Sequence, residues 1–190
     1  EETLRGYIQN LADNCKKDGH YIGTCYDGMK VFQVLKDKPN HTLEMEDEFG
    51  NRVYAVTQKY DITDFAYTKD NKQELLGQEI DVYMNSIGQT ITEYLVNFDM
   101  FVDIMKEYGF HLESPKLMGR YSGIFDTTAM SYTKGFGGFE QILKNLEHRV
   151  SNDADLRNDY KGCLEIMSAD NGPLRELSAL NNWFIFQKRE

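Results

Sequence analysis

The sequence has few of the residues that stabilise small secreted folds or cross membranes. Its three cysteines, Cys15, Cys25 and Cys163, lie at wide spacings that match neither a disulfide framework nor a four-cysteine zinc site. No stretch approaches the roughly 18 to 20 apolar residues that a bilayer-spanning helix needs. The residues after Glu1 also lack the progression of a secretory signal. These absences favour an intracellular chain with no membrane partner.

Basic residues and recognisable metal ligands are also scarce. The 21 Lys and Arg residues are outnumbered by 31 Asp and Glu residues, which gives a formal net charge of −10. This balance argues against a general nucleic-acid coat, because such proteins bind mainly by neutralising phosphates. The four histidines show no metal-ligand spacing, so we expect no metal site. No GxSxG, HExxH, EF-hand or CxxC motif is found.

What is present is typical of a folded domain. The chain has 190 residues, of which 41% are hydrophobic and 13% aromatic. This length supports one hydrophobic core but is short for two separate domains. No internal repeat and no linker rich in Pro or Ser divides the sequence. We therefore expect one domain, and because the chain does not begin with Met, we expect it to be part of a longer protein.

The first half predicts two helices and three strands. Apolar residues at helical spacing predict a helix over 2–17, and a short apolar run predicts a strand over 20–24. Asp27 is placed to cap a second helix. Alternating apolar and polar residues over 52–59 and 78–85 predict two antiparallel strands, whereas 36–50 is interpreted as a loop or an insertion. The inner face of the second helix is expected to consist of Val31, Phe32 and Leu35.

The segment from Thr90 has the pattern of a capped helix. Thr90 is followed three residues later by Glu93, which is the spacing of a capping box. Apolar residues then follow one helical face as far as Gly109. These residues are Ile91, Leu95, Phe98, Val102, Met105 and Tyr108. We therefore predict a long helix that begins at Thr90.

The last part of the chain gives weaker patterns. Short apolar runs predict strands over 110–112 and 183–186, and Phe139 with Ile142, Leu143 and Leu146 predicts a helix. The glycine cluster at 134–138 lacks the spacing of a phosphate-binding loop, so we interpret it as a turn. Residues 151–172 are polar and give no assignment. Local sequence patterns alone therefore predict only an acidic α/β or α+β domain.

Three segments carry a more specific signal. They are GHYIGTCYDGMKVFQVL (19–35), EFGNRVYAV (48–56) and ITEYLVNFDMFVDIMKEYGFHL (91–112). In this order they resemble mRNA cap guanine-N7 methyltransferases, and especially the capping enzymes of large DNA viruses. The resemblance covers essentially the whole chain and is weakest over 113–172. It implies an α/β fold that is the C-terminal half of a Rossmann-like methyltransferase, with a mixed sheet whose last strands are antiparallel, so that 1–190 is a single partial domain.

The resemblance also implies a function, a cofactor and partners. The family transfers a methyl group from S-adenosylmethionine to the guanine of the 5′ cap. No glycine-rich cofactor turn is found here, so we expect the cofactor-binding residues upstream of Glu1 and little activity from the isolated chain. The implied partners are the capped RNA 5′ end and the rest of a multifunctional capping enzyme, in the cytoplasm, a viral factory, a virion or the nucleus. The alternatives are a non-catalytic methyltransferase-like partner subunit and a cap-binding module without methyl transfer.

Four residues are expected at the cap guanine. Glu93 matches the family glutamate that accepts hydrogen bonds from the guanine edge, although it also completes the capping box. Tyr26 falls where several family members have a proline, and its ring is either a stacking surface or a surface tyrosine. The family tyrosine of the last strand matches Asn181 or Trp183. Tyr94 is a further candidate beside Glu93.

The cap phosphates require positive charge, and four basic residues are available for this role. They are Arg52, Lys59, Arg120 and Lys134. Exposed basic residues are most often simply solvated, so the sequence does not choose among them.

Overall fold

The computed structural model describes residues 2–113, 135–139, 154–166 and 172–190. These residues form two compact units. The first unit contains Tyr26–Ile104 and the second contains Thr3–Cys25 with Met105–Glu190. Compact units within one chain need not be separate domains, so the single partial domain over 1–190 stays a prediction.

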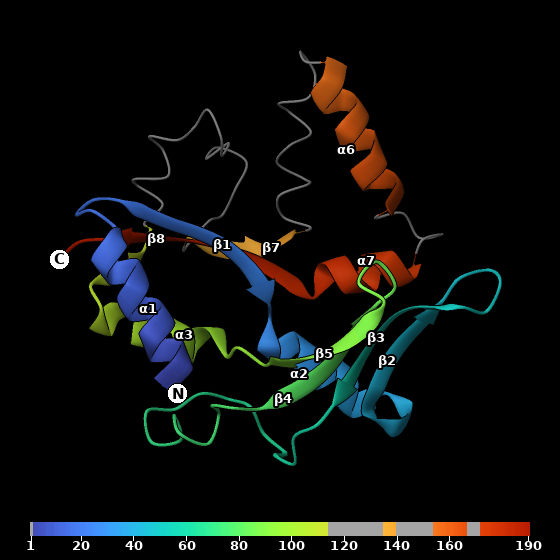
Figure 1. Ribbon diagram of the computed structural model, residues 1–190, viewed down its shortest axis with the longest axis horizontal. Helices are drawn as coiled ribbons and strands as arrows, with labels where there is room; N and C mark the ends of the chain where they lie inside the picture. Colours follow the sequence, from blue (N-terminus) through green and yellow to red (C-terminus); the bar gives the residue numbers. More distant parts are fainter. Residues whose placement is uncertain (1, 114–134, 140–153, 167–171) are drawn as a thin grey trace. The chain divides into compact units, whose positions relative to one another are not determined.

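The first unit is built on an antiparallel sheet of four strands in the order β2-β3-β4-β5 (Figure 1). The strands are β2 (Thr42–Glu46), β3 (Arg52–Gln58), β4 (Glu79–Met84) and β5 (Gln89–Tyr94). Each strand follows its neighbour along the chain, so short hairpin turns or one longer connection join them. The predicted antiparallel strands at 52–59 and 78–85 are therefore confirmed.

Helix α2 (Gly28–Asp37) packs against β2 and β3. The Asp27 carboxylate accepts hydrogen bonds from the backbone N–H groups of Met29 and Lys30, which confirms the predicted cap. The predicted inner face is confirmed too, since Val31, Phe32 and Leu35 are all buried. The Phe32 ring lies parallel to the rings of Tyr60 and Phe65, which continues the core from the helix into the connection after β3.

The prediction of a loop over 36–50 is wrong in part. A short 3₁₀ turn, η1 (Pro39–His41), is followed there by β2. Leu43 and Met45 are buried while Glu44 and Glu46 are exposed, so the segment has the period-two alternation of a half-buried strand. Its glutamates hid this alternation within an acidic run.

The prediction of a helix starting at Thr90 is also wrong. Residues 89–94 form β5, which pairs with β4, and helix α3 (Phe98–Glu107) begins four residues after the strand. Asn97 caps α3, because its side-chain oxygen accepts a hydrogen bond from the Met100 N–H. The threonines and the isoleucine at 90–92 are β-branched, and pairing with β4 prevails over the capping-box pattern.

The second unit has its own sheet, in which β8 lies between β1 on one side and β6 and β7 on the other (Figure 1). Its strands are β1 (His20–Tyr26), β6 (Phe110–Leu112), β7 (Phe136–Gly138) and β8 (Asn181–Lys188). Its helices are α1 (Glu2–Asn14), α6 (Ala154–Ile166) and α7 (Gly172–Ala179). The predicted first helix and the predicted strands at 20–24, 110–112 and 183–186 are confirmed.

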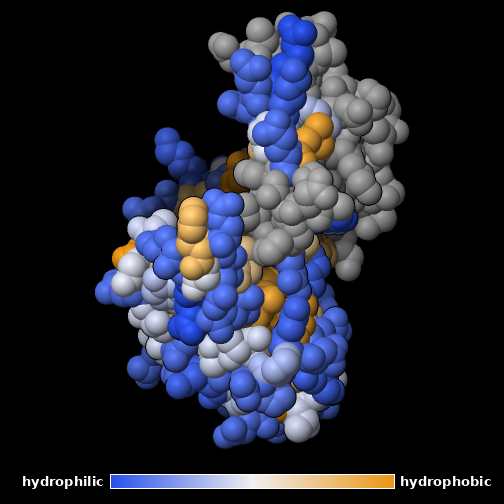
Figure 2. Space-filling view, turned by 90° about the vertical axis from the view of Figure 1, so that its right-hand side faces the viewer, coloured by the Kyte–Doolittle hydropathy of each residue, from blue (hydrophilic) through white to orange (hydrophobic). Residues whose placement is uncertain are grey.

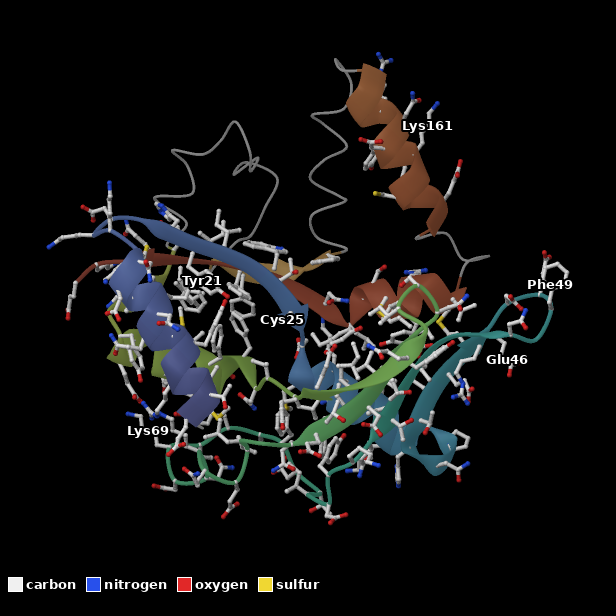
Figure 3. The ribbon with its side chains drawn as sticks, viewed as in Figure 1. Tyr21, Cys25, Glu46, Phe49, Lys69 and Lys161 are labelled. Atoms are coloured by element: carbon white, nitrogen blue, oxygen red, sulfur yellow. The ribbon has the colours of Figure 1, made fainter. Side chains whose placement is uncertain are left out.

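Aromatic residues form the core of this second sheet. Tyr21 of β1, labelled in Figure 3, contacts the ring of Phe184. The Phe184 ring in turn contacts that of Phe186. The carboxylate of Glu113 is only 1% exposed and lies 2.9 Å from His20 Nε2. This pairing provides a polar partner for a carboxylate that is buried in an otherwise apolar core.

The turn predicted at the glycine cluster is wrong. Residues 136–138 form β7, which pairs with β8 so that Phe136 lies opposite Phe184 and Gly138 lies opposite Asn182. A Cβ at Gly135 would lie 2.8 Å from Ile185 O, so glycine is needed there for close backbone packing. The helix predicted from Phe139 to Leu146 lies almost wholly outside the described residues. Part of the unassigned segment 151–172 is helix α6.

The face of the molecule in Figure 2 is mainly hydrophilic. Phe49, which is 81% exposed, lies in the turn between β2 and β3 (Figure 3). Isolated apolar residues on a surface are common and indicate no interface by themselves. No helix among the described residues is long and apolar enough to cross a membrane.

Gly28 provides a test of this packing. Its N–H donates to Val96 O at 3.0 Å, and an added Cβ would lie 2.5 Å from that oxygen. We expect Gly28→Ala to lower the free energy of unfolding by about 1 to 3 kcal/mol, as overpacking does. Gly6→Ala is the control, because Gly6 lies in α1 with open space around it. This substitution should raise the free energy of unfolding by about 0.5 to 1 kcal/mol. Urea denaturation of both variants checks this, and equal stabilities would contradict the close approach.

Candidate functional site

Tyr26 occupies a fixed position at the end of β1. The next residue, Asp27, caps α2, and Gly28 then forms its hydrogen bond with Val96 just beyond β5. Leu95 is held in turn by a hydrogen bond from its N–H to Gln78 O, at 2.8 Å. The segments around Tyr26 and around the end of β5 are therefore joined by backbone hydrogen bonds.

Glu93 lies on the edge strand β5, opposite Ile80 of β4. Paired residues share a face, so Glu93 lies on the side of the sheet that carries Ile80, Val82 and Tyr54. This is the side on which the buried residues gather, although Glu93 itself is only half-buried. Because Thr90 and Glu93 both lie within β5, Glu93 does not complete a helix capping box.

The Glu93 carboxylate makes no hydrogen bond or ion pair with any of the residues that the structure describes. Partial burial raises its pKa above the ordinary value, because removing water disfavours the charged form. A half-buried carboxylate without a donor costs stability. Such a group is a candidate for contact with a ligand that brings its own donors.

Two tyrosine hydroxyls meet within the same unit as this carboxylate. Tyr54 Oη donates a hydrogen bond to Tyr26 Oη at 3.3 Å. The negative charge of Glu93 adds to the burial that raises the pKa of both tyrosines. We call Tyr26, Tyr54 and Glu93 the tyrosine–glutamate cluster. It offers a carboxylate, a hydroxyl and an aromatic ring, which suits a planar heterocycle with polar edges.

The sequence analysis named Tyr26 and Glu93 as candidates but not Tyr54. The alternation in β3 predicts that Tyr54 shares a face with Val56, which the structure confirms. Nothing in the sequence indicates that the hydroxyl of this core tyrosine meets Tyr26.

The other two predicted residues lie elsewhere. Tyr94 neighbours Glu93 in β5, so its side chain lies on the opposite face of the sheet, where it is 58% exposed. Trp183 belongs to the second unit, where it is 4% exposed within β8. The alternative match, Asn181, donates a hydrogen bond to Leu177 O in the same unit. The tyrosine–glutamate cluster does not include these residues, whose roles stay predictions.

Two of the four basic candidates lie in the described residues, and each faces a carboxylate. Arg52 Nε pairs with Glu44, and the guanidinium carbon of Arg52 lies 5.9 Å from the centre of the Tyr83 ring. Lys59 Nζ lies 3.4 Å from Asp81. Arg120 and Lys134 lie outside the described residues. No group of three or more potential metal ligands is found in the part of the chain that the structure describes.

The α/β architecture with antiparallel sheets and a half-buried carboxylate does not by itself specify an activity. Comparison of the sequence with protein families is more specific. The family model for the mRNA (guanine-N(7))-methyltransferase domain matches residues 1–161. The chain therefore belongs to this family, which is consistent with the Rossmann-like fold class expected from the sequence.

The curated proteins to which the chain is similar are named as cap methyltransferases or as a capping enzyme. The chain is 27% identical to the mRNA cap guanine-N(7) methyltransferase of Saccharomyces cerevisiae, over 60% of this chain and 25% of the yeast protein. It is 24% identical to a probable mRNA-capping enzyme of Acanthamoeba polyphaga mimivirus, over 99% of this chain and 16% of the viral protein. A further match is the mRNA cap guanine-N(7) methyltransferase of Cryptococcus neoformans, 24% identical over 57% of this chain and 16% of that protein. The chain thus spans a quarter or less of these relatives.

Stability measurements test whether Glu93 has a structural partner. Its folded-state pKa is raised, so ionisation of Glu93 destabilises the fold as the pH rises through that pKa. We expect Glu93→Gln to match the wild-type melting temperature at acidic pH and to exceed it at neutral pH. Thermal melts across this range check the sign. A variant that is less stable than the wild type at neutral pH would show that Glu93 makes a stabilising bond.

Proposed function

We propose that the chain forms the cap-recognition part of an mRNA cap guanine-N7 methyltransferase, which transfers a methyl group from S-adenosylmethionine to nitrogen 7 of the cap guanine. The observation that carries this proposal is the Glu93 carboxylate, half-buried on the edge strand β5, within a chain that belongs to this family. The names of the relatives support the activity.

Glu93 suits the recognition of guanine. The guanine ring N–H and the neighbouring amine are parallel donors, and a carboxylate offers two acceptor oxygens at the matching spacing. Adenine presents an acceptor in place of the ring N–H. The water that Glu93 has already lost reduces the desolvation that binding requires, and the raised pKa of Glu93 is the corresponding cost in the free protein.

Tyr26 provides the aromatic surface for the base. Stacking of a nucleic-acid base on an aromatic side chain contributes about 1 to 3 kcal/mol. The cap of α2 and the Gly28 hydrogen bond hold the backbone beside Tyr26, so little conformational freedom is lost when a base binds.

The reaction requires the protein to align the methyl acceptor with the methyl donor. Nitrogen 7 of guanine already has a lone pair, so no general base is needed to activate it. Alignment of acceptor and donor supplies up to about 7 to 11 kcal/mol in well-oriented reactions. Methylation leaves a positive charge on the purine, and the Glu93 carboxylate stabilises this charge as it develops.

The turn after β1 does not fit S-adenosylmethionine. Val96 and Phe65 occupy the space beside Gly28, the glycine that follows β1, so this turn offers no open space for the cofactor. We therefore assign no residue of this chain to the cofactor and propose that another part of the complete protein binds it. The capped RNA 5′ end is the proposed substrate, and the rest of a multifunctional capping enzyme is the proposed covalent context. The role of a non-catalytic partner subunit is not favoured, because the relatives in yeast and Cryptococcus are named as methyltransferases.

Substitution of Glu93 in the complete enzyme tests the proposal. We expect Glu93→Gln and Glu93→Ala to lower kcat/KM for capped RNA by at least about 100-fold, because two charge-assisted hydrogen bonds are lost. Binding of S-adenosylmethionine and the melting temperature should not fall. Methyl transfer to capped RNA and calorimetry with the cofactor measure these quantities.

Glu79→Gln is the matched control. Glu79 is exposed on the neighbouring strand β4, where it pairs with Tyr94 on the opposite face of the sheet. We expect Glu79→Gln to leave kcat/KM unchanged. Near-normal turnover by Glu93→Ala would refute the role of Glu93.

A further inference from the structure

The turn between β2 and β3 is held in one conformation by its own hydrogen bonds. Asp47 Oδ1 accepts hydrogen bonds from the backbone N–H groups of Phe49 and Asn51, at 2.9 and 2.8 Å, and the Asn51 amide donates to both Asp47 oxygens. Two backbone hydrogen bonds close the turn, from the Asp47 N–H to Asn51 O and from the Gly50 N–H to Asp47 O. Residues 46–51, which we call the acidic turn, therefore form a preorganised tip.

Phe49 is the apolar side chain that the acidic turn presents to solvent. It is 81% exposed, and Figure 3 shows it at the tip of the hairpin. Its ring stacks on no other ring in the described part of the chain. The turn uses only the backbone N–H of Phe49, which any residue except proline supplies, so the turn itself does not explain an aromatic side chain at this position.

The rigidity of the turn adds to what exposure alone indicates. A single exposed aromatic residue is no sign of an interface by itself. An aromatic residue that is already held in place loses little conformational freedom when it enters a pocket, and such residues are common anchors of protein interfaces. Phe49 therefore has the properties of a preorganised anchor.

The charge around Phe49 restricts what this anchor can bind. Residues 46–48 are Glu, Asp and Glu, and they lie directly before Phe49. Arg52 is the only basic residue between 42 and 58, and it is paired with Glu44. This excess of negative charge repels the phosphates of RNA and of an anionic membrane surface. The chemistry that fits the acidic turn is an apolar pocket bordered by Lys or Arg side chains of a protein.

The size of the contact favours a pocket within the same protein. Burial of one phenylalanine removes about 150 to 250 Å² of surface from water. Separate proteins that associate stably bury about 1,200 to 2,000 Å² in total, which one turn does not provide. A contact within one chain benefits from a high effective concentration, so a small anchor is sufficient there. The chain spans a quarter or less of the curated relatives named above, so most of each relative lies outside the matched part.

We propose that Phe49 and the acidic turn dock into an apolar pocket with a basic rim in another part of the complete protein. The inference rests on the proposed function only in taking this chain as one part of a larger capping enzyme. The contact fixes the sheet of the first unit to that part, and the acidic turn takes no part in RNA binding.

Photo-crosslinking of the complete enzyme tests this contact. Phe49→p-benzoylphenylalanine keeps an aromatic ring at the tip, and mass spectrometry after irradiation identifies the crosslinked peptide. We expect a crosslink within one molecule, to a segment outside these 190 residues that carries apolar side chains next to Lys or Arg. A crosslink between two molecules, a crosslink confined to these residues, or no crosslink would overturn the proposal.

Charge reversal in the same background tests the basic rim. We expect Glu48→Lys to lower the crosslinking yield by about 2- to 5-fold, as loss of an exposed ion pair does. Raising NaCl from about 0.1 M to about 1 M shortens the Debye length from about 10 Å to about 3 Å, so the yield should fall there too. A yield that responds to neither change would show that no basic rim faces the acidic turn, and the proposal would fail.

Ile87 is the matched control position. It is 50% exposed in the turn between β4 and β5, and residues 85–88 of that turn include no acidic residue. We expect Ile87→p-benzoylphenylalanine to give much less of the peptide that is crosslinked from position 49. An equal yield from both positions would show that the crosslink is unspecific and would contradict the proposal.

The crosslink and the methyl transfer can be measured independently. Normal turnover by Glu93→Ala together with the expected crosslink from position 49 would refute guanine recognition and leave the docking contact standing. Loss of turnover in Glu93→Ala without a crosslink from position 49 would refute the docking contact and leave the proposed function standing.

Discussion

The hydrogen bond from the Gly28 N–H to Val96 O is the constraint on which the candidate site depends. It joins the start of α2 to the chain just after β5, two segments that are far apart in the sequence. Tyr26 lies two residues before Gly28, and Glu93 lies three residues before Val96. Only glycine permits this approach, because any Cβ would overlap with Val96 O. The end of β1 and the end of β5 are thus joined by a backbone contact.

Around this contact, the protein keeps a charged group in an environment that disfavours its charge. Partial burial raises the pKa of Glu93, and no described residue compensates it with a hydrogen bond. Packing in the surrounding core offsets this loss of stability, since Phe32 of α2 stacks on both Tyr60 and Phe65. A carboxylate placed in this way gains more from a ligand with two donors than from water, which is the physical basis for assigning it to recognition.

Much of the fold could be predicted from local patterns. Alternation identified β3 and β4, and helical spacing together with Asp27 identified α2 and its buried face. The errors arose where two patterns compete in a short segment. In β2 the acidic residues concealed alternation, and at 90–94 a capping-box spacing coincided with β-branched residues that pair with β4. Which pattern prevails depends on the neighbouring strand, and a local sequence window does not contain that neighbour.

The difference between helix and strand at Glu93 decides what its side chain can do. In a helix that begins at Thr90, the carboxylate would accept a hydrogen bond from its own first turn and would be partly occupied. In β5, alternation sends Thr92 and Tyr94 to the other face and leaves Glu93 on the side of Tyr54. The helix instead begins after Asn97, which caps it. One short segment therefore supplies the carboxylate proposed for recognition, the Val96 carbonyl that accepts the Gly28 hydrogen bond and the cap of the next helix. These roles are compatible only because the strand ends before the helix starts.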